Sequence, residues 1–209
     1  MAHRLKLRSD LHLARKIWHA AGVGAMAILF DRFGYSWAWT FLIAIAVIIV
    51  PLDLLRQRRP GLNATTVRLF SPVMRKHEES GMSGMSYLFA GAAILLALFD
   101  RHVVTLTLLF LAFGDPVASY CGIRFGKDRI VGNKTLQGSI GAFVACGAIA
   151  AIYFYARGLM VERLWIVAPV AGLIGAVAEA IPVGKLDDNL TFPVIAACLL
   201  WTLFLLFGS

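Results

Sequence analysis

The chain has 209 residues, of which 59% are hydrophobic and only 15% charged, and its mean hydropathy is +0.76. Soluble domains average about 45–50% apolar and about 25% charged residues, so this balance excludes disorder, a coiled coil, a collagen and a small disulfide scaffold. It predicts an all-α polytopic membrane helix bundle that forms a single domain over residues 1–209, with a net charge of +8 to be explained.

Seven apolar segments follow one another along the chain, each near the roughly 20 residues that cross a bilayer. The first is short, the fourth is interrupted only by Asp115, and the sixth only by Glu179. Their apolar runs are continuous instead of alternating, which predicts seven transmembrane helices. The predicted spans are 17–30, 36–52, 80–99, 102–123, 135–156, 164–184 and 190–209.

The basic residues between these segments predict the orientation. Sixteen lysines and arginines fall on the side that holds the N-terminus and four on the other side, which places the N-terminus in the cytoplasm and the C-terminus outside. This asymmetry accounts for most of the positive charge, so we expect no nucleic-acid partner. The basic segment 1–16 has no cleavage site after a short apolar run and is expected to stay as a cytoplasmic segment.

A basic cluster stands at the cytoplasmic mouth of the first predicted span. Arg15 and His19 are one helical turn apart, with Lys16 beside them. Arg15 could hold a phosphate through two hydrogen bonds, and His19 could orient a phosphate or a lipid headgroup. The alternative is that these side chains only anchor the helix end to lipid headgroups.

Two glutamates precede the third span. Glu79 is a candidate metal ligand or general base. Acids ahead of a helix also complement its dipole, which is the alternative.

Asp115 and Glu179 are carboxylates inside apolar spans, and such residues indicate a functional site. Pro116 disfavours helical geometry at Asp115, so the fourth span is expected to break there. Counted at 1.5 Å per residue, both acids fall at a similar, cytoplasmic depth. The alternatives are a helix N-cap for Asp115 and a buried basic partner for Glu179.

The loop after the fourth span combines glycines with basic side chains, as a triphosphate site requires. It is not a Walker A loop, because the glycine spacing is wrong and Asp128 follows Lys127 where serine or threonine is needed. The alternative is an ordinary basic cytoplasmic loop. The candidate nucleotide-binding residues are Gly122, Gly126, Lys127, Lys134, Thr135 and Gly138.

Asp187, Asp188 and Asn189 stand before the last span. Oxygen ligands in a row suit Mg²⁺, which uses few protein carboxylates and shares phosphates with them. The candidate metal ligands are Asp115, Glu179, Asp187 and Asp188. Aspartate and asparagine also cap helices, so a cap for the last span is the alternative.

As a set, these motifs resemble the dolichol and polyprenol kinase family, which includes CTP-dependent diacylglycerol kinases and phytol kinases. The resemblance covers roughly the whole chain, since the motifs occur in family order. It implies that Arg15, Lys16, Asp115 and Gly122 are essential. The chain is also similar to phosphatidate cytidylyltransferases in its Gly-Asp and Lys-Thr-x-x-Gly stretches, but lacks their C-terminal basic and His-Gly-Gly stretch.

The resemblance implies transfer of the γ-phosphate of CTP to a membrane lipid alcohol with Mg²⁺: polyprenol or dolichol, diacylglycerol, or phytol. Lys127, Lys134 and Thr135 are expected to hold the triphosphate, and Arg15 or Lys16 to meet the transferring phosphate. Either Asp115 or Glu79 would take the hydroxyl proton. The alternatives are a phosphatidate cytidylyltransferase and a small transporter. The expected location is a bacterial inner membrane or an endoplasmic reticulum membrane; nothing in the sequence indicates an oligomer.

Overall fold

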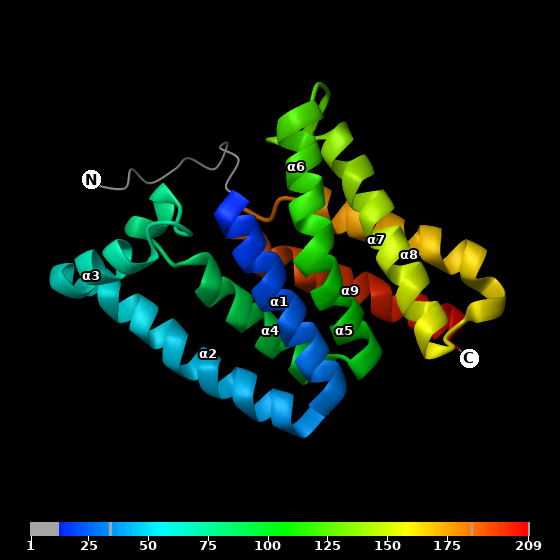
Figure 1. The fold of residues 1–209 in the computed structure, drawn as a ribbon, viewed down its shortest axis with the longest axis horizontal. Coiled ribbons are helices and arrows are strands. Elements are labelled where there is room, and N and C mark those ends of the chain that lie inside the picture. The colour runs from blue at the N-terminus through cyan, green and yellow to red at the C-terminus, as the bar shows by residue number, and fades with distance from the viewer. Residues whose placement is uncertain (1–12, 34, 185, 209) are drawn as a thin grey trace.

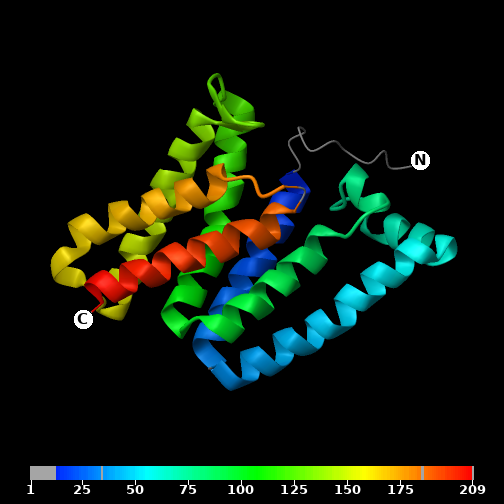
Figure 2. The same cartoon turned by 180° about the vertical axis from the view of Figure 1, so that it is seen from behind.

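A computed structural model describes residues 13–33, 35–184 and 186–208, so most of the predicted N-terminal cytoplasmic segment lies outside the described residues. The described chain is a bundle of helices with one small β-hairpin (Figures 1 and 2). In chain order the elements are α1 (Leu13–Phe33), α2 (Tyr35–Arg58), α3 (Pro60–Phe70), η1 (Lys76–Glu79), α4 (Gly84–Leu98), α5 (Arg101–Leu109), η2 (Phe110–Gly114), α6 (Asp115–Phe125), β1 (Arg129–Val131), β2 (Lys134–Thr135), α7 (Leu136–Arg157), η3 (Val161–Arg163), α8 (Leu164–Ala180) and α9 (Asp188–Phe207).

The all-α membrane class is confirmed, and five helical stretches are long and apolar enough to cross a membrane. They are Thr40–Arg58, Arg101–Phe125, Leu136–Arg157, Val161–Ala180 and Asp188–Phe207. α4 is apolar but has only 15 residues. α1 occupies the place of the first predicted span but is not among the five. The seven-span count and the orientation stay predictions.

The predicted break at Asp115 is wrong. α5, η2 and α6 form one continuous helical stretch, and Asp115 has helical angles (φ −61°, ψ −47°). The five residues of η2 make a π turn instead, in which the Asp115 N–H reaches back to the Phe110 carbonyl. Pro116 has no N–H and its ring crowds the preceding turn, so the helix accommodates it by widening rather than by ending.

Small residues bring η2, α7 and α8 close together. Cys146 on α7 is fully buried, and a Cβ on either Gly114 of η2 or Gly175 of α8 would collide with its sulfur. α7 and α8 also meet where Gly147 faces Gly172. The backbones around the π turn are therefore fixed by direct helix contact.

Ion pairs hold the C-terminal end of α1 against α5 and α7. Asp31 is buried and pairs with Arg101 at the start of α5 and with Arg157 at the end of α7. Asp31 lies sixteen residues from Arg15, or roughly 24 Å along the helix. The two ends of α1 thus join two separate charged clusters.

Candidate active site

Lys134 connects three elements at one end of the bundle. It lies on the hairpin between α6 and α7, whose turn uses Gly132 with a left-handed φ of 57°. The Lys134 Nζ donates to Oε1 of Glu179 at 2.8 Å and to Oδ2 of Asp188 at 3.4 Å. Residues separated by 45 and 54 positions therefore meet at one ammonium group.

The charge state of Lys134 follows from these contacts. Burial lowers the pKa of Lys134, but the negative charges of Asp188 and Glu179, with Asp115 adding to them, outweigh burial and raise the pKa above its ordinary value of 10.5. Lys134 is therefore a fixed cation at neutral pH, which is what phosphate binding needs.

Glu179 keeps one oxygen without a partner. Its side chain is 6% exposed, and Oε2 accepts no hydrogen bond from any described residue. An unpaired buried carboxylate oxygen is costly unless something outside the chain contacts it. This is the strongest sign in the described residues that the site receives a ligand.

Asp115 is half-buried and faces the same region. It interacts electrostatically with Lys134 and Glu179 on one side and with Lys16 and His19 of α1 on the other. Lys16 also donates to the Pro116 carbonyl at 3.4 Å. The acid that the sequence singled out therefore stands between α1 and the hairpin cluster.

His19 contacts the π turn directly. Its Nε2 lies 3.1 Å from the carbonyl oxygen of Leu111. In the π register that oxygen would accept from residue 116, but proline has no N–H. Leu111 is fully buried, so its oxygen needs another donor, and His19 supplies it through a protonated Nε2.

Arg15 is held by a residue that the sequence reasoning missed. Its Nη1 donates to Oε1 of buried Glu78 at 2.7 Å and to the Val73 carbonyl at 2.9 Å. The neighbouring candidate, Glu79, has an exposed side chain. Two adjacent glutamates carry the same sequence signal, and only the path of the loop decides which one turns inward.

A buried ion pair shapes that loop. Arg56 on α2 is 3% exposed, bonds Asp53, and donates to the carbonyls of Glu78 and Gly81 at 2.8 Å each. Asp53 in turn accepts from the backbone N–H of Ser83 at 2.7 Å. The loop that presents Glu78 to Arg15 is thus fixed from α2.

The glycines of the predicted nucleotide loop allow close packing of α6 on the start of α7. A Cβ on Gly122 would lie 3.1 Å from Oγ1 of Thr135, and one on Gly126 would lie 2.8 Å from its Cγ2. A Cβ on Gly138 would lie 3.0 Å from the Ala118 carbonyl oxygen. Thr135 itself caps α7 by accepting from Gly138 N–H at 3.2 Å. These residues build the corner that carries Lys134.

Lys127 is exposed and lines a cavity of about 450 Å³ beside this corner. Its backbone N–H donates at 3.0 Å to Gln137, which also binds Asp128 and so fixes the loop. The remaining lining residues are Arg124, Phe125 and Gly126. The cavity offers two cations and an aromatic ring at the surface.

Asp187 acts as the cap that was the alternative prediction. Its Oδ1 accepts from Asn189 N–H at 3.0 Å, and its Oδ2 lies 3.5 Å from Nη1 of Arg75. The Asn189 side chain donates to the Gly84 carbonyl at 3.0 Å. In both views the connection between α8 and α9 passes beside the start of α1 (Figures 1 and 2). The start of α9 is therefore bonded to α4 and to the loop before it, which also holds Arg15.

The acids fit a cation shared with a substrate better than one held by protein alone. Over the three described ranges, no three histidine, cysteine or acidic side chains group closely enough to form a metal site. Mg²⁺ is usually held by one or two carboxylates together with substrate phosphates. The unpartnered oxygen of Glu179 and the nearby Asp115 match that donor set.

The chain is similar to enzymes of known activity. It is 32% identical to CTP-dependent diacylglycerol kinase 1 of Schizosaccharomyces pombe, over 90% of this chain and 92% of that protein. It is 25% identical to CTP-dependent diacylglycerol kinase 1 of Saccharomyces cerevisiae, over 88% of this chain and 71% of that protein. An uncharacterised protein of Rickettsia prowazekii is 28% identical over 93% of this chain and 95% of that protein. No family model and no solved structure matches the chain.

Proposed function

The chain belongs to the family of CTP-dependent diacylglycerol kinases and is a phosphotransferase, and from this premise we propose that it transfers the γ-phosphate of CTP to the hydroxyl of diacylglycerol. The names of the relatives favour diacylglycerol among the lipid alcohols. The wider likeness to dolichol, polyprenol and phytol kinases stays a prediction, which makes those alcohols the alternative acceptors. We place the reaction at the cytoplasmic face.

The observation that carries this proposal is the meeting of Lys134 with Glu179 and Asp188 beside Asp115. Phosphoryl transfer needs positioning and charge neutralisation more than covalent groups. Lys134 supplies a fixed positive charge, and the Glu179 oxygen that lacks a partner is available to position a ligand. The same arrangement would serve a lipid hydroxyl that enters between helices.

We assign binding of the triphosphate to Lys134 and Lys127. The close packing around Thr135 sets the position of Lys134. Arg15 or Lys16 would contact the transferring phosphate from α1. Asp115 would accept the hydroxyl proton; Glu79, with its exposed side chain, is the alternative base.

Asp115, Glu179 and Asp188 would hold Mg²⁺. Both oxygens of Asp187 already have partners, so we assign that residue to capping. When bound, Mg²⁺ would neutralise charge on the phosphates during transfer.

The test is a reconstituted assay with CTP labelled at either the α or the γ phosphorus. Transfer of γ label to diacylglycerol, with CDP as the second product, supports the kinase. Transfer of α label to the lipid with release of pyrophosphate would show a cytidylyltransferase instead. A panel of diacylglycerol, polyprenol, dolichol and phytol, each with CTP or ATP, identifies the acceptor and the donor.

A further inference from the structure

α3 packs mainly against α2 and is otherwise open in the described chain. It has 11 residues, Pro60–Phe70, and none of them is buried. Figure 1 shows it at the end of α2, away from the bundle formed by α5 to α9. The candidate span Thr40–Arg58 ends just before it, with only Arg59 between them. α3 therefore directly follows a candidate membrane span.

The composition of α3 suits a membrane surface. Leu62 and Leu69 are seven residues apart and so lie on one face, with exposed fractions of 40% and 69%. Phe70, next along the chain, is 42% exposed. The helix contains no acidic residue. Apolar side chains on one face without an acid elsewhere are typical of helices that lie in the bilayer interface.

Three exposed arginines lie on α3 or just before it. Arg58, Arg59 and Arg68 are exposed, and none forms a salt bridge with an acid of the described chain. The nearby Arg56 is the contrast, because it is buried against Asp53. Among the described residues, the positive charge of these three arginines is therefore not balanced by a salt bridge, and Arg59 lies beside Leu55 and Leu62.

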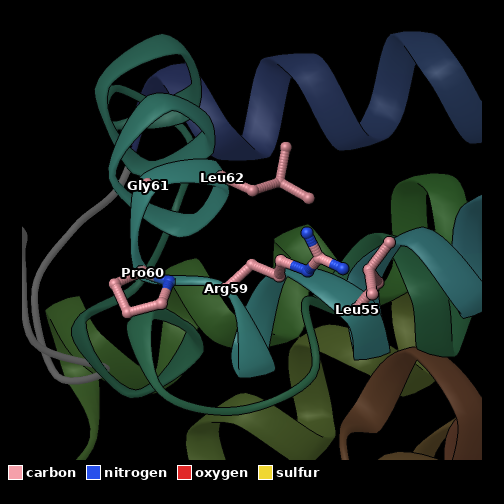
Figure 3. Close-up of a pocket in the computed structure, with 5 residues that line it drawn as sticks. All are labelled: Leu55, Arg59, Pro60, Gly61 and Leu62. Atoms are coloured by element: carbon pink, nitrogen blue, oxygen red, sulfur yellow. The ribbon is translucent and has the colours of Figure 1, made fainter.

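Arg59 also lines a cavity of about 500 Å³ at the corner between α2 and α3. Leu55, Pro60, Gly61 and Leu62 complete its lining. Figure 3 shows the Arg59 side chain extended beside Leu55, with Leu62 on the other side of the opening. A guanidinium between leucines can bind a phosphate while the leucines contact the carbon atoms attached to it.

We propose that this corner, made of Arg58, Arg59, Arg68, Leu62 and Leu69 and called here the α3 surface, binds the anionic phospholipids of the bilayer. The partner is the membrane itself, because the α3 surface directly continues a span and carries charge of the opposite sign to such lipids. The proposal concerns a lipid contact outside the kinase site, and it stands or falls separately from the proposed reaction.

The experiment measures lipid preference. The full chain is placed in phosphatidylcholine vesicles that contain a trace of spin-labelled phosphatidylglycerol or spin-labelled phosphatidylcholine, and the immobilised fraction of each label is compared. The wild-type chain is expected to prefer phosphatidylglycerol. Arg59→Gln should lower that preference by up to about fivefold, the factor that one arginine near an anionic bilayer contributes. The triple variant Arg58→Gln, Arg59→Gln, Arg68→Gln should lower it further.

A matched triple variant removes the same charge elsewhere. Arg32→Gln, Arg129→Gln, Arg163→Gln changes three exposed arginines away from α3 and should keep the preference. Equal loss in both triple variants would overturn the proposal, since net charge alone would then be responsible. An unchanged preference in the α3 triple variant would overturn it as well.

The alternative partner for the apolar side chains of the α3 surface is a second copy of the chain. Leu62→Ser, Leu69→Ser should leave the particle mass in detergent unchanged and weaken immobilisation of phosphatidylglycerol. A change of mass with unchanged lipid preference would identify the α3 surface as a protein interface and reject the lipid proposal.

Discussion

The Nζ of Lys134 lies 2.8 Å from Oε1 of Glu179, and through this contact a hairpin residue neutralises a carboxylate at the end of α8. The other oxygen of Glu179 has no partner among the described residues. The pair therefore stabilises the buried acid and leaves it able to contact a ligand. Mutation of each partner can separate the effect of the pair on stability from its effect on activity.

Lys134→Met is expected to lower the free energy of unfolding by about 3 kcal/mol, because it leaves Glu179 charged and buried without its cation. Activity should be lost with it. Glu179→Gln removes the same ion pair but leaves Lys134 paired with Asp188, and the double variant Lys134→Met, Glu179→Gln should recover most of the stability but none of the activity. Thermal midpoints in detergent and the labelled-CTP assay check this. A double variant as unstable as Lys134→Met would contradict it.

Asp115→Asn is expected to lower kcat by about 100-fold or more, with little change in thermal midpoint, because a charge near the transferring phosphate is removed while the side-chain shape is kept. Asp100→Asn is the matched control: Asp100 is an exposed cap at the start of α5. That variant should lose some stability and little activity. Retained turnover in Asp115→Asn would remove the central residue from the proposed mechanism.

His19→Phe should destabilise the chain by about 1–3 kcal/mol, since it leaves the buried Leu111 carbonyl unbonded. It should also lower kcat, because the π turn presents Asp115. His19→Gln, which keeps a donor, should be milder.

Combining Pro116→Ala with His19→Phe tests whether His19 serves the Leu111 carbonyl. Alanine restores an N–H at position 116, which gives Leu111 a backbone donor, so His19→Phe should cost less stability there than in the wild-type chain. Simple additivity of the two substitutions would show that His19 does not serve the carbonyl that the proline leaves open.

Glu78→Gln and Glu79→Gln form a matched pair of neighbours. The first replaces the ion pair with Arg15 by a neutral hydrogen bond and should raise KM for CTP or lower kcat at least tenfold, because Arg15 loses the charge that holds it. The second changes an exposed side chain and should have a small effect. A larger loss in Glu79→Gln would favour Glu79 as the general base and would reverse the assignment made from burial.

Sequence patterns predicted the all-α membrane class well because continuous apolar runs identify helices that can cross a bilayer. They also placed Asp115 and Glu179 in one region, since helical rise converts sequence number into depth. The response of the helix to Pro116 was not predictable in the same way. A broken helix and a π turn satisfy the same local rule, and the choice depends on a donor, His19, that is 92 residues from Leu111.

The partner of Arg15 was hidden for a related reason. Glu78 and Glu79 are equivalent in sequence, and the inward one is selected by Arg56, which holds the carbonyls of that loop from α2. Long-range hydrogen bonds of this kind leave no periodic signal. The glycines at 122, 126 and 138 were recognised as a unit, but their visible effect is helix packing around Thr135 rather than open backbone.

The Asp31 ion pairs and the Lys134 cluster lie toward opposite ends of α1, and it is the Lys134 cluster that lies next to Asp115. A kinase built this way serves a single leaflet. Moving a newly charged headgroup through hydrocarbon is costly, so the phosphorylated lipid stays in the leaflet where it was made. A separate protein would have to move the phosphorylated lipid if it were needed in the opposite leaflet. The rate of phosphorylation would depend on the amount of lipid alcohol in the leaflet that faces the site.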